Sequence, residues 1–130
     1  MTSNPYADPS PWLLRVLWIL ATAVLGLVIA LLTLNVQVNV PSNFALSDKV
    51  FHMAAFAALV LPTAILQPGW APRVGLGALV YGGVIELIQP SFGRGAEWLD
   101  FLANGVGIVA GLILGTLLRR VARRVRAHLA

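Results

Sequence analysis

The sequence predicts an all-α integral membrane protein, a bundle of four transmembrane helices with both termini in the cytoplasm. Hydrophobic residues make up 58% of the 130-residue chain and charged residues 11%, whereas a soluble domain is about 45–50% apolar and about 25% charged. Four long apolar stretches are separated by short segments that contain polar residues or proline. Most basic residues lie beside one set of span ends, as expected for a membrane protein with cytoplasmic termini.

The N-terminal part divides into a lead and a first span. Residues 1–12 are polar and proline-rich, which predicts a disordered lead. Residues 16–34 carry no charge and are long enough to cross a hydrocarbon core. The apolar core of a cleaved signal peptide is about 7–15 residues and ends in a small-residue cleavage site. This stretch is longer and lacks such a site, so we expect a retained helix that opens a membrane domain over residues 13–118.

The remaining spans follow from the positions of apolar and turn residues. Asn35 to Ser47 is a polar connection, and Ser47 and Asp48 are helix N-cap candidates. Two prolines predict a tight turn over residues 67–72, and a second loop is expected over 90–98. The second, third and fourth spans are predicted over residues 50–67, 73–89 and 101–118.

Charge distribution predicts the orientation of these spans. Arg15, Arg73 and the C-terminal arginines share one side, whereas Lys49 and Arg94 lie on the other. Basic residues concentrate in cytoplasmic segments, so residues 119–130 are predicted to form a basic cytoplasmic tail. We expect this tail to bind anionic lipid rather than nucleic acid. Its five arginines are Arg119, Arg120, Arg123, Arg124 and Arg126.

Polar residues gather at the opposite, extracytoplasmic ends of three spans. Ionisable side chains in spans usually face a bundle interior or a water-filled cavity, and pairs three or four residues apart share a helix face. The sequence therefore predicts a polar pocket, with Lys49 and Arg94 as available cations for the isolated Glu86. A structural network that clamps the helices would use the same groups. The predicted pocket residues are Asp48, Lys49, His52, Glu86, Gln89, Arg94, Asp100 and Asn104.

The fourth span carries small residues at helical spacing, Gly107, Gly111 and Gly115. Such spacing allows close helix approach. We expect packing within the chain, with the glycine-rich third span as the natural partner, and we favour this over homodimerisation.

Motifs for cofactors and covalent catalysis are missing from the sequence. There is no cysteine, no glycine-rich phosphate loop, and no serine in a nucleophile pattern. His52, Glu86 and Asp100 could converge on a metal, but one histidine with carboxylates is a weak indication. We therefore expect no cofactor and no metal, and catalytic residues stay unassigned.

The order of the polar motifs resembles the VanZ-like family of small bacterial membrane proteins. The motifs are Asp48-Lys49-x-x-His52-x-x-x-Phe56, Gly83-x-x-Glu86-Leu87-x-Gln89, Arg94, Asp100, Asn104 and Gly107-x-x-x-Gly111. The residue after Asn104 is often threonine or a small polar residue in the family, and here it is Gly105. The resemblance implies a protein of the bacterial cytoplasmic membrane. The founding member is associated with low-level resistance to the lipoglycopeptide teicoplanin.

Three functional hypotheses follow. In the first, the pocket binds an anionic headgroup of an envelope lipid or lipid-linked precursor, with Lys49 and Arg94 contacting the headgroup. In the second, His52 with Glu86 or Asp100 supplies acid–base or metal-assisted catalysis on a lipid-linked substrate. In the third, the protein is a structural or accessory subunit with a polar clamp. The sequence assigns no oligomeric state.

Overall fold

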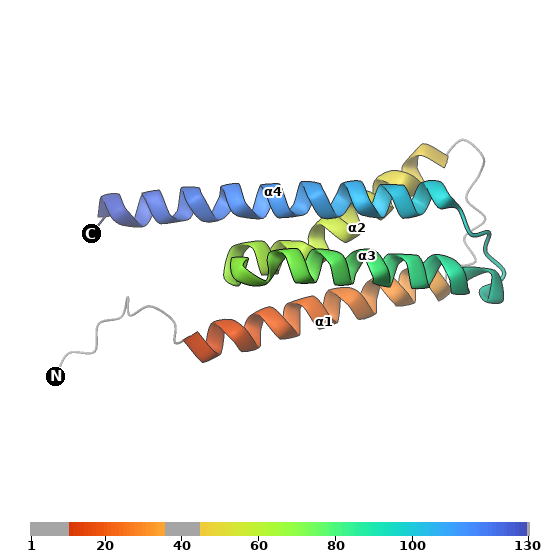
Figure 1. Ribbon diagram of the computed structural model, residues 1–130, viewed down its shortest axis with the longest axis horizontal. Helices are drawn as coiled ribbons and strands as arrows, with labels where there is room; N and C mark the ends of the chain where they lie inside the picture. Colours follow the sequence, from red (N-terminus) through yellow and green to blue (C-terminus); the bar gives the residue numbers. More distant parts are fainter. Residues whose placement is uncertain (1–10, 36–44, 130) are drawn as a thin grey trace.

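In the part of the chain that the structure describes, the fold is an all-α arrangement of four long helices and two short 3-10 helices (Figure 1). The computed structural model describes residues 11–35 and 45–129. All four long helices are long and apolar enough to cross a membrane, so the predicted four-helix membrane fold is confirmed. The helices in chain order are α1 (Pro11–Asn35), α2 (Ala45–Leu66), η2 (Pro68–Trp70), α3 (Ala71–Ile88), η3 (Gln89–Phe92) and α4 (Trp98–Leu129).

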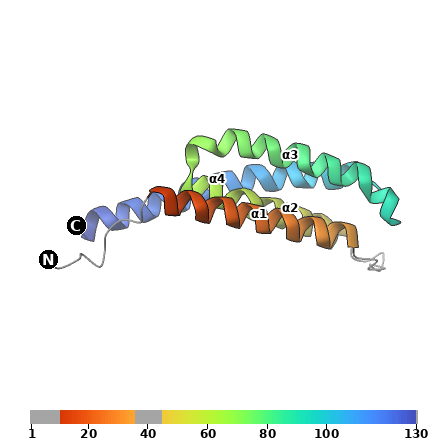
Figure 2. The ribbon, with the colours of Figure 1, turned by 90° about the horizontal axis from the view of Figure 1, so that it is seen from below.

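Consecutive long helices run in alternating directions (Figures 1 and 2). The first residues of α1, the α2–α3 turn and the last residues of α4 therefore lie at one end of the molecule, which we call the basic end. The end of α1, the start of α2 and the α3–α4 connection lie at the other, which we call the polar end. Whether the basic end faces the cytoplasm stays a prediction.

Two predicted boundaries differ from the structure. Residues 1–10 of the predicted lead lie outside the described part of the chain, but Pro11 and Trp12 already belong to α1. The connection before α2 is described only from residue 45, where α2 begins. Ser47 and Asp48 thus lie inside the first turn of α2 rather than at its N-cap.

The glycine stripe of α4 packs against α2. A Cβ atom added to Gly107 would overlap the carbonyl of Met53, and one added to Gly111 would overlap the carbonyl of Ala57. One added to Gly115 would lie 2.5 Å from the Cβ atom of Ala64. The expectation that α3 is the partner was therefore wrong. The alanine-rich surface of α2 lets the two backbones approach closely, as small residues do in membrane helix pairs.

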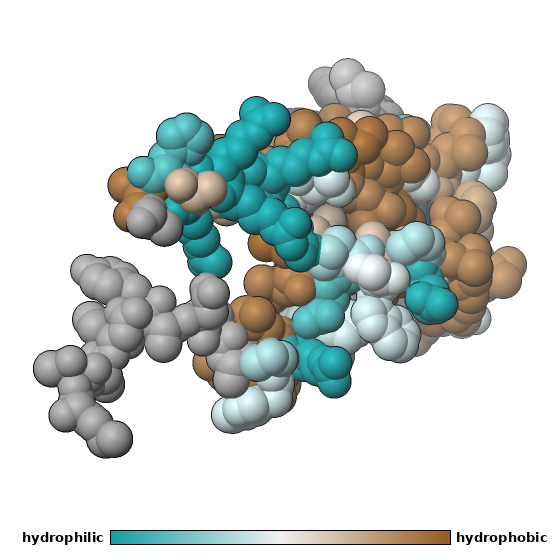
Figure 3. Space-filling model, turned by 60° about the vertical axis from the view of Figure 1, so that its left-hand side comes forward, coloured by the Kyte–Doolittle hydropathy of each residue, from teal (hydrophilic) through white to brown (hydrophobic). Residues whose placement is uncertain are grey.

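The core between the helices is apolar and includes Phe56, Val60, Ile85 and Ile108. Large apolar side chains are also exposed along the outer faces of every long helix. Such an outer surface suits a lipid surrounding. Viewed from the basic end, hydrophilic residues gather in front of these hydrophobic flanks (Figure 3).

The basic tail continues α4 without a break to Leu129. Residues 120–129 are all exposed, and α4 extends past the other helices at this end (Figure 1). Arg120, Arg123, Arg124 and Arg126 therefore lie on an exposed extension of a helix whose first part belongs to the bundle, whereas Arg119 is half-buried at the end of the bundle.

A tryptophan of α1 is hydrogen-bonded to α2 near the basic end. Trp18 Nε1 donates to Thr63 Oγ1 over 2.7 Å, and Thr63 is completely buried. The Trp18 ring also packs against Trp70 at a centroid distance of 5.8 Å. This contact fixes α1 against the α2–α3 hairpin.

Candidate binding site at the polar end of the bundle

Helical spacing brings the predicted polar residues of α2 and α4 to one region. His52 lies one turn after Asp48, and Asn104 lies one turn after Asp100. His52, Asp100 and Asn104 are at most 4% exposed, so they face the interior, as ionisable residues in spans usually do.

A hydrogen bond between α2 and α4 fixes the imidazole of His52. Its Nδ1 lies 3.0 Å from Oδ1 of Asn104. The carboxamide nitrogen of Asn104 lies against Gly82 of α3, where an added Cβ would be 2.9 Å from that nitrogen and 3.0 Å from the Phe56 ring. The absence of a side chain at Gly82 therefore leaves room for Asn104 and Phe56 to pack against α3. The sequence analysis missed this role, although Gly82 lies one turn before Glu86.

Lys49 links α2 to the start of α4. Its Nζ donates to Asp100 Oδ1 over 2.7 Å and to Glu97 Oε2 over 2.8 Å. The bond from Lys49 holds the pKa of Glu97, which lies in the α3–α4 loop, below its ordinary value of 4.5. Glu97, which the sequence analysis left outside the pocket, thus belongs to the network.

Glu86 of α3 is buried, but its partner is not a cation. Its Oε2 accepts a hydrogen bond of 3.2 Å from the backbone N–H of Glu97. Within the described residues, Lys49 and Arg94 form their ion pairs with other carboxylates. Of the two cations available to Glu86, neither forms an ion pair with it, because Lys49 lies beside Glu97 and Asp100 and Arg94 lies beside Asp48.

Several buried polar atoms have no hydrogen-bond partner among the described residues. Four of them belong to the polar end, namely Glu86 Oε1, both Oε1 and Nε2 of Gln89, and Asn104 Nδ2, and the other two are Thr22 Oγ1 and Arg119 Nη1. Gln89 is 1% exposed and Asn104 is completely buried. Gly82 and Glu86 of α3 lie one turn apart on one face, and Gln89, the first residue of η3, follows three residues after Glu86. Four of the six unsatisfied atoms therefore belong to three residues at the polar end of the bundle.

Arg94 connects the α3–α4 loop to two other helices. Its Nη1 donates to the backbone oxygen of Thr33 in α1 over 3.1 Å. Its Nη2 lies 3.8 Å from Asp48 Oδ1. The participation of α1 had no signal in the sequence, because a backbone carbonyl can be supplied by any residue type.

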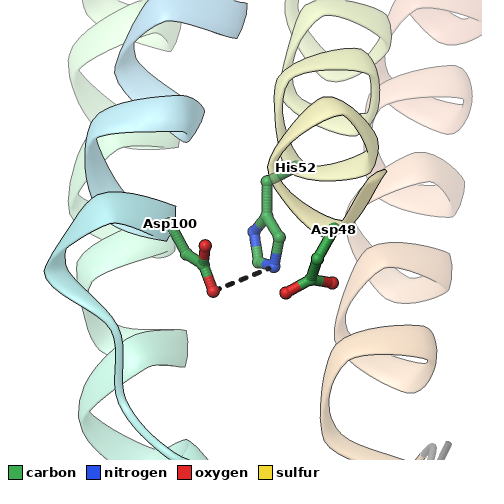
Figure 4. A group of neighbouring side chains, drawn as sticks. All are labelled: Asp48, His52 and Asp100. Atoms are coloured by element: carbon green, nitrogen blue, oxygen red, sulfur yellow. Dashed lines mark ion pairs between the residues drawn. The ribbon is translucent and has the colours of Figure 1, made fainter. Parts of the chain in front are cut away.

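Two carboxylates flank the His52 imidazole (Figure 4). His52 Nε2 lies 3.8 Å from Asp100 Oδ2, and one ligand atom each from Asp48, His52 and Asp100 lies within 4.8 Å of the others. Asp48, rather than Glu86, therefore completes the group of possible metal ligands around His52 and Asp100.

The whole polar cluster contains more acidic than basic side chains. It holds four carboxyl groups and two permanently basic groups, besides His52. The four carboxyl groups belong to Asp48, Glu86, Glu97 and Asp100, and the two basic groups to Lys49 and Arg94. The cluster can therefore accept a positive group, and its unpartnered amides can accept or donate hydrogen bonds.

The comparisons with known proteins give no relative from which a role could be transferred. No protein-family model, no curated protein and no solved structure matches the chain. The chemistry of the polar end therefore rests on its own geometry, and membership of the VanZ-like family stays a proposal.

Proposed function

We propose that this multi-pass membrane protein binds the polar headgroup of an envelope lipid or a lipid-linked precursor at its polar end. The observation that supports this most is the group of buried, unpartnered atoms of Glu86, Gln89 and Asn104. Buried polar groups in native proteins nearly always have a partner, and each one left without a partner costs about 1–3 kcal/mol. A headgroup rich in hydroxyl or amine groups would supply those partners.

The location at a span end supports a lipid as the source of the headgroup. Lipid headgroups lie beside the ends of transmembrane helices, and the outer surfaces next to the cluster are apolar. A groove of about 650 Å³ runs between α1 and α3, from Ala30 and Tyr81 to Trp70 and Arg73 at the basic end. This groove could take an acyl chain while the headgroup contacts the polar end.

The ion pairs change the roles expected for the two cations. Lys49 is held by Glu97 and Asp100, and Arg94 lies beside Asp48. An anionic headgroup would have to displace these carboxylates to reach Lys49 or Arg94. In our proposal the cations orient the carboxylates, and the amides of Gln89 and Asn104 contact the headgroup.

The resemblance to the VanZ-like family extends this proposal to the bacterial cytoplasmic membrane and to lipoglycopeptide susceptibility. Lipoglycopeptides such as teicoplanin carry an acyl chain and act at the outer surface of this membrane. A protein that binds an envelope lipid there could alter how much lipid or precursor the drug meets. The polar motifs from Asp48 to Asn104 support the family proposal.

Lipid analysis of a nearly isosteric variant tests the binding role. The wild type and Gln89→Met are extracted from membranes in polymer nanodiscs, and the lipids retained by each are measured by mass spectrometry. We expect the wild type to enrich one headgroup class and Gln89→Met to lose that enrichment at equal protein yield. Gln67→Met, the same change at the basic end, should retain it. Equal enrichment in Gln89→Met and the wild type would contradict the proposal.

An acid–base enzyme is a second candidate, favoured by the position of His52 beside Asp100. His52 Nε2 is 3.8 Å from Asp100 Oδ2, and the other ring nitrogen, His52 Nδ1, is hydrogen-bonded to Asn104, which orients the ring. An oriented imidazole next to a carboxylate can exchange protons with a bound substrate. Incubation of purified protein with envelope lipids, followed by product analysis, tests this candidate. Turnover that disappears in His52→Gln would favour catalysis over binding alone.

A further inference from the structure

We propose that Asp48, His52 and Asp100 form a binding site for a divalent transition-metal ion. This inference does not depend on the lipid proposal. The three side chains come from two helices, and one ligand atom of each lies within 4.8 Å of the other two. Figure 4 shows the imidazole between the two carboxylates, with Nε2 directed toward the space they border. Imidazole and carboxylate are common ligands of Zn²⁺.

The hydrogen bond on the far side of the ring supports a lone pair at Nε2. His52 Nδ1 faces the side-chain oxygen of Asn104 at 3.0 Å, and an amide oxygen accepts hydrogen bonds, so the tautomer with its proton on Nδ1 fits this contact. A neutral imidazole then has an unprotonated Nε2. In this tautomer the Nε2 lone pair is directed at the space between the two carboxylates, where a cation would be attracted by all three groups.

The spacing fits a metal ion better than a direct hydrogen bond. The 3.8 Å between His52 Nε2 and Asp100 Oδ2 exceeds hydrogen-bond distance. Two ligand atoms bound to one Zn²⁺ at about 2.0–2.2 Å in tetrahedral geometry lie about 3.3–3.6 Å apart. Small rotations of the aspartate side chains would bring all three ligand atoms to that spacing.

Each proposed ligand is also oriented by an outer partner, as in established metal sites. Asn104 holds the imidazole of His52. Lys49 binds Asp100 through Oδ1 and leaves Oδ2 directed at the imidazole. Arg94 lies 3.8 Å from Oδ1 of Asp48.

Charge and access also favour a divalent ion. The cluster has four carboxyl groups and two basic groups, so its carboxyl groups outnumber the cations available to pair with them, which favours binding of a cation. The side chain of Asp48 is 30% exposed, so an ion can enter past it. Three protein ligands leave a coordination position for water or a ligand oxygen.

Metal titration of the purified, detergent-solubilised chain tests this site, with Zn²⁺, Mn²⁺ and Mg²⁺ as separate probes. We expect about one Zn²⁺ per chain, bound more tightly than Mn²⁺ and far more tightly than Mg²⁺, because an imidazole ligand favours Zn²⁺. Asp48→Asn should weaken Zn²⁺ binding by more than about tenfold. Asp48 is partly exposed and its ion pair is long, so this variant should fold.

Matched variants separate this site from adventitious binding. His52→Gln should weaken Zn²⁺ binding at least as much as Asp48→Asn, whereas His128→Gln, which changes the exposed histidine of the tail, should leave it unchanged. Circular dichroism of each variant checks that it is folded. A folded wild type that binds no Zn²⁺ or Mn²⁺ would overturn the proposal. Unchanged Zn²⁺ binding by folded Asp48→Asn and His52→Gln would overturn it as well.

Discussion

His52 and Asn104 face each other across the α2–α4 interface, with Nδ1 and Oδ1 3.0 Å apart. Close packing of the two helix backbones lies directly beside this pair. Met53 follows His52 in α2, Gly107 lies three residues after Asn104 in α4, and a Cβ atom on Gly107 would overlap the carbonyl of Met53. The packing of the glycine stripe and the hydrogen bond of the site are therefore parts of one interface. A change that separates the helices should also separate His52 from Asn104.

The first prediction concerns this glycine stripe. Gly111→Ala should lower the free energy of unfolding by about 1–3 kcal/mol, the usual cost of overpacking, because the new Cβ would overlap the carbonyl of Ala57. Reversible unfolding in mixed micelles measures the change. Gly77→Ala on α3 is the matched control, since nothing lies within 4 Å of a Cβ there. It should be neutral or stabilising by up to about 1 kcal/mol, and equal losses in both variants would contradict this packing.

The second prediction concerns the Trp18–Thr63 hydrogen bond. Trp18→Phe removes the donor and leaves the buried hydroxyl of Thr63 without this partner, which should cost about 1–3 kcal/mol. When Thr63→Val is added, part of that loss should be recovered, because no hydroxyl then needs a partner. A double-mutant cycle measures the coupling. Strictly additive losses would show that the bond contributes nothing.

The third prediction is a pH dependence at Glu97. Its pKa is lowered in the folded protein because Lys49 donates a hydrogen bond to it. The stability gained from this pair is therefore fully present above pH 4.5 and is lost as the pH falls through the lower folded-state pKa. The side chain is 58% exposed, so the gain should stay below about 1 kcal/mol.

Unfolding experiments between neutral and acidic pH can isolate this effect. Glu97→Gln should be less stable than the wild type at pH 7, and the difference should vanish at acidic pH. In a Lys49→Met background the same substitution should have no pH-dependent effect. A difference that persists in that background would point to another partner of Glu97.

The fourth prediction concerns orientation in the membrane. The chain contains no cysteine, so single cysteines can be introduced at exposed positions of the two ends. Ser91→Cys should react with an impermeant maleimide in intact cells, and Ala127→Cys should react only after the cells are permeabilised. Basic residues favour the cytoplasmic side. The opposite labelling pattern would reverse the predicted topology.

The sequence predicted the four spans and the meeting of Asp48, His52, Asp100 and Asn104, because span length and helical spacing are local properties. It did not predict that the glycine stripe packs on α2, since every helix of this chain offers small residues and only the three-dimensional arrangement selects one. The sequence also did not predict that Gly82 packs against Asn104 or that the Thr33 carbonyl accepts a hydrogen bond from Arg94. A missing side chain and a backbone oxygen carry no chemical signature in a sequence.

The partners of Glu86 show a second limit. Sequence reasoning placed Lys49 and Arg94 on the same side of the membrane as this carboxylate, and opposite charges attract. The structure instead gives Glu86 a backbone N–H from Glu97. Charge sign and depth define which groups are candidates, but the path of the α3–α4 loop decides which of them meet.

The central claim is that the unpartnered atoms at the polar end bind a ligand rather than hold the helices together. Thermal unfolding of the wild type and Gln89→Met, in lipid-free detergent and with added envelope lipids, tests it most directly. Without lipid, Gln89→Met should be at least as stable as the wild type, because the apolar side chain leaves no buried amide unsatisfied. Lipid should raise the melting temperature of the wild type only. A Gln89→Met protein that is less stable without lipid, or that gains as much from lipid as the wild type, would contradict the claim.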